Sequence, residues 1–156
     1  MVNFHKKISG KRNEVICIIF LLFFSVSFNQ YYGFQGINPI DSFFSFNTGY
    51  DILNGHYPFK DYWTITGPFI DFTLAILFKI FGVSWSIYVL YASIFNFIFT
   101  IATFYILYKF GLNFYYCFLY AFLVSILAYP SAGTPYEDHQ ASFLSIIAVY
   151  CFILAL

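Results

Sequence analysis

The chain has 156 residues with no net charge; 61% are hydrophobic and only 9% are charged. A soluble domain of this length needs roughly 25% charged residues to cover its surface, and the mean hydropathy is +0.75. The composition therefore excludes an ordinary soluble domain, argues against a nucleic-acid partner and predicts an all-α polytopic membrane protein.

The first predicted transmembrane helix covers the apolar run of residues 15–28. Four basic residues precede it: Lys6, Lys7, Lys11 and Arg12. Because positive charge beside a first span stays in the cytoplasm, residues 1–14 are expected to form a cytoplasmic tail. The same signals fit a cleaved secretory signal peptide. An uncleaved anchor is preferred, and both alternatives deliver the following residues to the outer side.

Residues 29–82 form the predicted first outer loop, which contains two helices lying in the membrane interface. The first covers 41–55, where four apolar residues recur at helical spacing: Phe43, Phe46, Tyr50 and Leu53. Asp41 is its predicted N-cap, and Gly55 ends it. The second covers 68–82, bounded by Pro68 and Gly82, with Lys79 reaching towards head groups.

Three more spans are predicted, at residues 83–108, 112–129 and 141–156, with a second outer loop at 130–140. The last run is shorter than the about 20 residues that cross a bilayer. We therefore expect residues 1–156 to be one membrane domain, the N-terminal part of a longer protein.

Six carboxylates fall in the predicted outer segments: Asp41, Asp51, Asp61, Asp71, Glu137 and Asp138. Asp51 and Asp71 are expected to be solvated on the polar faces of the interfacial helices. Asp61 is expected to fix its loop, through Lys60 or a backbone amide. Asp41 either caps the N-terminus of its helix, which is a purely structural role, or takes part in a reaction.

The triplet Glu137, Asp138 and His139 has two interpretations. Oxygen ligands and one imidazole could hold a divalent ion. Alternatively, acidic residues at this point stabilise the N-terminus of the following helix.

The ordered features of the first half resemble GT-C type membrane glycosyltransferases, especially dolichyl-phosphate-mannose protein mannosyltransferases and lipid A aminoarabinose transferases. The resemblance extends over about residues 12–156, with an early outer-loop aspartate and the stretch "GHYPFKDYWTITGPFIDFTLAILFKIFGVS". The matching positions are Gly55, Pro58, Phe59, Asp61, Trp63, Gly67, Pro68, Leu77, Phe78, Phe81 and Gly82.

The resemblance implies an incomplete GT-C fold of about four spans and a transferase that takes a sugar from a polyprenyl-phosphate carrier. It implies Asp41 as the catalytic carboxylate, although family members often carry Asp-Glu where this chain has Asp41-Ser42. Glu137 or Asp138 would be the second-loop acid, and a divalent cation, if used, would bind among these three acids. Reactions of this kind serve protein glycosylation or lipopolysaccharide modification in the cell envelope.

The candidates for substrate binding include the acids Asp61, Glu137 and Asp138, together with other polar and aromatic residues of the loops. His56, Lys60 and His139 could stabilise the departing phosphate, while Tyr57, Tyr62 and Trp63 could stack on sugar faces. Surface snorkelling and loop hydrogen bonds are equally good explanations of the three basic residues.

Two other functions stay open: a transporter or flippase-like protein, and a non-catalytic remnant. Transporters place charged groups within their spans. Between residues 83 and 129 the only charged residue is Lys109, at a predicted membrane edge. This favours a reaction at the membrane surface over transport through the spans.

Overall fold

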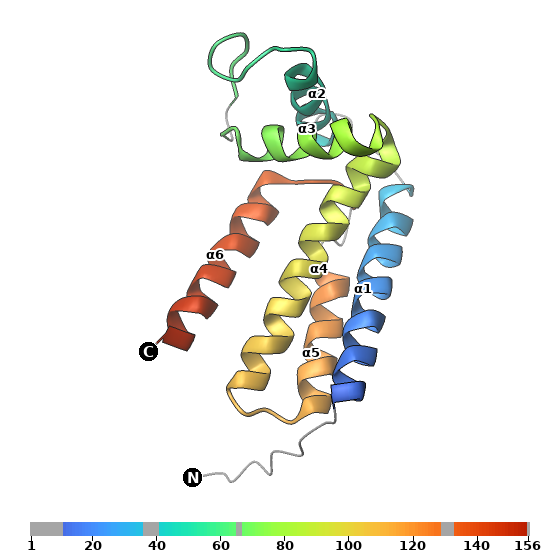
Figure 1. Ribbon diagram of the computed structural model, residues 1–156, viewed down its shortest axis with the longest axis vertical. Helices are drawn as coiled ribbons and strands as arrows, with labels where there is room; N and C mark the ends of the chain where they lie inside the picture. Colours follow the sequence, from blue (N-terminus) through green and yellow to red (C-terminus); the bar gives the residue numbers. More distant parts are fainter. Residues whose placement is uncertain (1–10, 36–40, 65–66, 129–132, 156) are drawn as a thin grey trace.

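A computed structural model describes residues 11–35, 41–64, 67–128 and 133–155, with Asp41 and Ser42 described by their backbone alone. The regular elements in these ranges are six α-helices (Figure 1), which confirms the predicted all-α class. They are α1 (Lys11–Gly33), α2 (Asp41–Leu53), α3 (Phe69–Phe81), α4 (Trp85–Lys109), α5 (Phe114–Leu127) and α6 (Glu137–Ala155).

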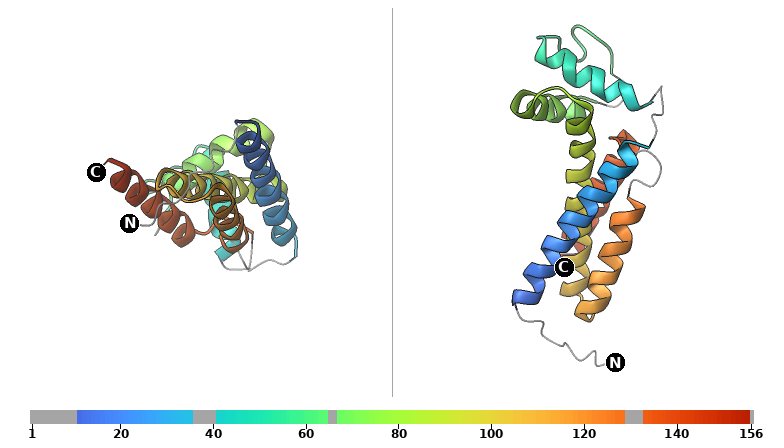
Figure 2. Two further views of the ribbon diagram at one scale, coloured as in Figure 1. Left: turned by 90° about the horizontal axis from the view of Figure 1, so that it is seen from below. Right: turned by 90° about the vertical axis from the view of Figure 1, so that its right-hand side faces the viewer.

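Three of these helices, α1, α4 and α6, are long and apolar enough to cross a membrane. α4 is the central one: 56% of its most apolar window is buried, against 17% for α1 and 11% for α6. α5 packs beside α4 and α1 (Figures 1 and 2) but has only 14 residues. The chain is therefore a helical membrane protein by length and composition, while the fourth predicted span stays a prediction.

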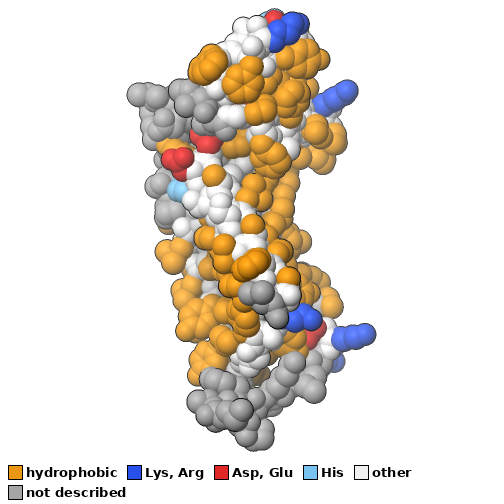
Figure 3. Space-filling model, turned by 90° about the vertical axis from the view of Figure 1, so that its left-hand side faces the viewer, with side chains coloured by type: hydrophobic (Ala, Val, Ile, Leu, Met, Phe, Trp, Pro, Cys, Tyr) orange, Lys and Arg blue, Asp and Glu red, His pale blue; other side chains and the backbone are white. Residues whose placement is uncertain are grey.

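The predicted outer segments gather at one end of the bundle (Figure 1). The end of α1 and the starts of α4 and α6 meet α2 and α3 there, whereas Lys11 and Lys109 lie at the opposite end. Figure 3 shows hydrophobic side chains over the middle of one face, with charged side chains confined to its two ends. This is the distribution expected of a protein whose middle lies in hydrocarbon.

Buried polar side chains join the long helices. Asn29 of α1 donates through Nδ2 to Ser93 Oγ of α4 at 3.2 Å and to the Gly133 carbonyl at 2.9 Å. Asn96 of α4 donates to the Ser125 carbonyl of α5 at 2.9 Å. Such bonds hold helices together where lipid replaces water as the solvent.

α2 and α3 form a separate layer over the outer end of the bundle (Figures 1 and 2), and they pack closely at one glycine. A Cβ at Gly49 would lie 3.0 Å from Leu74 side-chain atoms, so only glycine fits without movement. The helix predicted at residues 41–55 is found as α2, and its four apolar residues lie in two environments. Phe46 and Leu53 pack on the core, but Phe43 and Tyr50 are exposed, because α2 turns the neighbouring polar side inwards.

Candidate functional site

Four side-chain contacts link four helices at the outer end of the bundle, in a circuit that is completed through the backbones of α2, α3 and α6. The circuit runs from α2 to α6, then to α4 and α3, and back to α2. Its members carry hydroxyl, amide or carboxyl groups, and we call them the polar ring: Ser45, Thr48, Asp71, Thr73, Tyr91, Glu137 and Gln140.

α2 contributes two hydroxyls to the polar ring, one turn apart, and each donates to a carboxylate of another helix. Ser45 Oγ donates to Glu137 Oε1 at the start of α6, at 2.6 Å. Thr48 Oγ1 donates to Asp71 Oδ1 near the start of α3, also at 2.6 Å. Ser45 and Thr48 are both buried. These charge-assisted bonds fix α2 between two acids that are far apart in the sequence.

The other half of the polar ring passes through α4. The hydroxyls of Thr73 and Tyr91 lie 2.6 Å apart, and Thr73 is the donor when the single Tyr91 proton is directed to Gln140. Tyr91 Oη donates in turn to Gln140 Oε1 at 3.3 Å. Gln140 follows Glu137 by three residues on α6, which puts both on one helix face and closes the polar ring.

Asp71 is the most deeply buried carboxylate among the described residues, with 1% of its surface exposed. The expectation that it is solvated is wrong, because α2 covers the polar side of α3. Burial raises the pKa of the Asp71 carboxyl above its ordinary value; hydrogen bonds from Thr48 and Tyr62 oppose this rise, and the charge of Glu137 adds to it.

The loop between α2 and α3 is anchored to the polar ring by Tyr62. The Tyr62 hydroxyl donates to Asp71 Oδ2 at 3.3 Å. Burial, and then the charge of Asp71, raise the pKa of the Tyr62 hydroxyl. Tyr62 thus stays protonated and keeps its role as a donor.

Asp61 organises the outer part of the same loop, as predicted. Its Oδ2 accepts from the Tyr57 backbone N–H at 2.9 Å and lies 3.8 Å from Lys60 Nζ. Phe59 has a positive φ of 65°, a strained conformation for this residue type, within the turn that Asp61 closes. His56 and Trp63 are exposed.

The triplet of residues 137–139 belongs to the first turn of α6, which agrees with the helix-terminus interpretation. Glu137 enters the polar ring, whereas Asp138 is exposed. The His139 ring lies 6.3 Å from the Phe143 ring and nearly parallel to it.

Asp41 is the first residue of α2, and its side chain lies outside the described residues. Position 41 is one helical turn before Ser45, so positions 41, 45 and 48 follow one face of α2. Among the side chains that the structure describes, no three His, Cys, Asp or Glu residues are grouped to hold a metal ion. The proposed metal set of Asp41, Glu137 and Asp138 includes one residue beyond that description.

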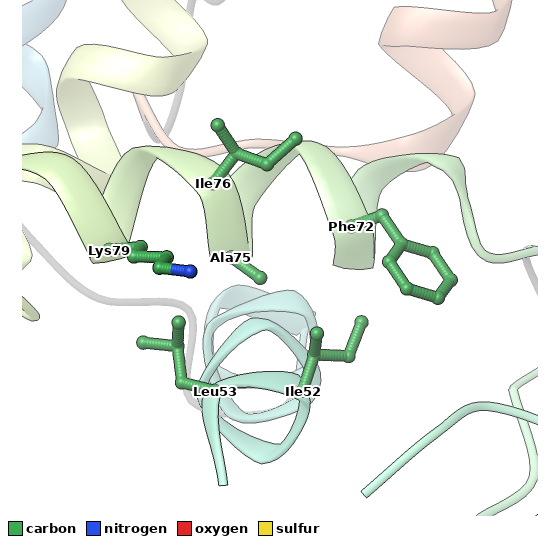
Figure 4. Close-up of a pocket in the computed structure, with 6 residues that line it drawn as sticks. All are labelled: Ile52, Leu53, Phe72, Ala75, Ile76 and Lys79. Atoms are coloured by element: carbon green, nitrogen blue, oxygen red, sulfur yellow. The ribbon is translucent and has the colours of Figure 1, made fainter. Parts of the chain in front are cut away.

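A small groove of about 330 Å³ lies between α2 and α3. In Figure 4 the side chains of Ile52 and Leu53 from α2 lie opposite Phe72, Ala75 and Lys79 from α3. The groove is apolar except for the Lys79 ammonium, which gives it the character of a site for a hydrocarbon chain with an anionic end.

Comparisons of the chain with protein-family models, with curated proteins and with solved structures found no match. The site therefore has to be interpreted from its own chemistry. Sequence reasoning named Glu137 of the polar ring, and Tyr62 beside it, as site residues. It missed the other six members: Ser45, Thr48, Asp71, Thr73, Tyr91 and Gln140. The signal that was present is the spacing of Ser45 and Thr48 at i and i+3, which puts two hydroxyls on one side of α2.

Proposed function

We propose that this protein is part of a glycosyltransferase that moves a sugar from a polyprenyl-phosphate carrier to a lipid, glycan or protein acceptor. The reaction takes place at the outer face of the cytoplasmic membrane, with the N-terminus in the cytoplasm. The basic residues Lys11, Arg12 and Lys109 at the end of the bundle opposite α2 and α3 support this orientation.

The observation that carries the proposal is the hydrogen bond from Ser45 to Glu137. Ser45 lies one turn after Asp41 on α2, and Glu137 begins α6. The first part of α2, which follows Asp41, therefore lies beside the start of α6, which carries Glu137. A transferase needs such convergence, because one site must both activate an acceptor and hold a donor.

In the proposed reaction Asp41 accepts the proton of the acceptor hydroxyl. The hydroxyl oxygen forms a bond to the anomeric carbon of the donor sugar, and the bond from that carbon to the phosphate oxygen breaks. The phosphate leaves with the bonding electrons. His56, Lys60 and His139 are candidates to stabilise its charge, and Glu137 holds the site in position through Ser45.

Two further features suit a lipid-linked sugar. Trp63 is 77% exposed and Tyr57 is also exposed, so their rings can stack on a sugar face. The groove beside Lys79 can hold part of an isoprenoid chain. A transporter is less well supported, since the described parts of α4 and α5 carry no charged residue except Lys109 at the end of α4.

The test is transfer of a radiolabelled sugar from polyprenyl phosphate in membranes that contain the protein at the full length its gene encodes. Asp41→Asn should abolish transfer, because an amide cannot take the proton. Asp51→Asn, a matched change on the same helix, should leave transfer near the wild-type rate. Undiminished transfer by Asp41→Asn would remove Asp41 from the mechanism.

A further inference from the structure

Gln140 carries the one polar-ring atom that lacks a hydrogen-bond partner among the described residues. Only 2% of Gln140 is exposed. Its Oε1 accepts from Tyr91, but its Nε2 finds no acceptor in the described part of the chain. A buried amide donor left unpaired costs about 1–3 kcal/mol, so an acceptor from outside these residues is expected at this atom.

The surroundings of Gln140 define what kind of acceptor fits. The charged members of the polar ring are Asp71 and Glu137, both acidic, and the members other than these and Gln140 itself carry hydroxyls. Asp71 lies within electrostatic range of both Glu137 and Tyr91. A further carboxylate placed at this point would meet like charge, whereas a hydroxyl can accept from the amide and donate to a carboxylate at once.

We propose that the polar ring is the subsite for the donor's sugar ring, that Gln140 donates to one of its hydroxyls, and that this sugar is uncharged. A sugar ring supplies several hydroxyls, and one of them can accept from the Gln140 amide. The proposal rests on the proposed function, and it adds a specificity-determining residue and a substrate class: neutral sugars in preference to uronic acids.

Gln30 provides a matched control for changes at Gln140. It lies on α1, and its Nε2 is already paired with the Ser86 carbonyl at 3.1 Å. Gln140→Leu and Gln30→Leu remove the same amide group, but only the first acts on the polar ring. Gln140→Met, which keeps an unbranched side chain, guards against loss of folding as the cause of an effect.

The first experiment compares transfer from a neutral sugar donor with transfer from its monodeoxy analogues, using the full-length protein. One deoxy donor should be about tenfold poorer in kcat/KM for the wild type, because it leaves Gln140 unpaired. In Gln140→Leu and Gln140→Met this penalty should disappear, whereas Gln30→Leu should keep it. A penalty of the same size in all variants would overturn the proposal.

The second experiment does not depend on transfer. Saturation-transfer NMR measures binding of methyl hexosides and a methyl hexuronide to the protein in lipid nanodiscs. Wild type and Gln30→Leu should bind the hexosides and not the hexuronide, and both Gln140 variants should lose the signal. Equal binding by the Gln140 variants, binding of the hexuronide as strong as that of the hexosides, or no Gln140-dependent signal in either experiment overturns the proposal.

The two experiments distinguish the failure of this proposal from the failure of the proposed function. Transfer with an unchanged deoxy penalty in the Gln140 variants would leave the transferase intact and remove the subsite. Gln140-dependent binding of hexosides without transfer from any polyprenyl-phosphate donor would retain the sugar subsite and remove the transferase.

Discussion

The polar ring and the loop of residues 54–63 both lie at the outer end of the bundle, yet the Asp71 carboxylate of the ring is buried and the Asp61 carboxylate of the loop is partly exposed. Asp61 in the loop is 32% exposed in its side chain and lies near Lys60, itself 74% exposed. Asp71 is 1% exposed, has no cation among its described partners, and is held by hydroxyl donors from two other elements. Solvent thus screens one acid, while the protein itself must stabilise the other.

That difference indicates separate roles for the two regions. An exposed ion pair contributes about 0–1 kcal/mol, so the loop is suited to bind and release a ligand. A buried carboxylate with two hydroxyl donors is fixed in position, so the polar ring is suited to hold reacting groups in register. We expect changes at the carboxylates of the polar ring to lower kcat and changes in the loop to raise KM.

The largest expected effect is on Glu137. Glu137→Ala should lower kcat by about 100-fold or more, because α2 loses its contact with α6 and Asp41 loses its position. The neighbouring Asp138→Ala should keep a rate close to the wild type, since Asp138 is exposed. Steady-state transfer kinetics measure both. Equal losses in the two variants would show that local charge, rather than the Ser45 contact, matters.

A smaller effect is expected on stability when the Asp71 donor is removed. Thr48→Val leaves the Asp71 carboxylate with one hydroxyl donor and should lower the free energy of unfolding by about 2 kcal/mol. Lys60→Met removes the partner of the exposed Asp61 and should cost less than about 1 kcal/mol. Thermal unfolding of the purified variants in one detergent compares them. A larger loss in Lys60→Met would reverse the assignment of the two regions.

The pH dependence of stability should separate the two regions further. The pKa of Asp71 is higher in the folded than in the unfolded protein, so the folded state binds this proton more tightly. Its contribution to stability is therefore full below the unfolded pKa and is lost as pH rises through the folded pKa, by up to about 1.4 kcal/mol per pH unit. Unfolding temperatures of wild type and Asp71→Asn from about pH 4 to about pH 8 measure this.

In that experiment the wild type should lose stability relative to Asp71→Asn as pH increases. A constant difference between wild type and Asp71→Asn at all pH values would contradict the buried, shifted carboxyl.

The smallest expected effect is at Trp63 in the loop. Trp63→Ala should raise KM for the donor about fivefold through lost stacking on the sugar, with kcat unchanged. Its stability should stay within about 0.5 kcal/mol of the wild type, because the ring is 77% exposed. A fall in kcat with constant KM would move Trp63 from binding to catalysis.

Much of the fold could be predicted because hydrophobic runs and terminating residues are local signals. The helix predicted between Pro68 and Gly82 is found at Phe69–Phe81, with Gly82 at a φ of 88°. The helix at residues 41–55 is also present, with Gly55 at a φ of 84°. Each boundary depends on residues within a few positions of it.

The site was harder to predict because burial depends on contacts between distant segments. Nothing near Asp71 in the sequence indicates that Thr48 covers it from 23 residues away. The bond from Ser45 to Glu137 joins residues 92 positions apart. A polar residue on an amphipathic helix is solvated unless another element packs there, and only the tertiary arrangement decides this.

The central claim is that α2 and the start of α6 are joined through Ser45 and Glu137. Its most direct test places cysteines at these two positions, in a chain whose Cys17, Cys117 and Cys151 are replaced by alanine. A short thiol-reactive crosslinker is added to native membranes, and the products are mapped by mass spectrometry. The account predicts efficient linkage of 45 to 137 and none of 56 to 137. Linkage of 56 to 137 in preference to 45 to 137 would contradict it.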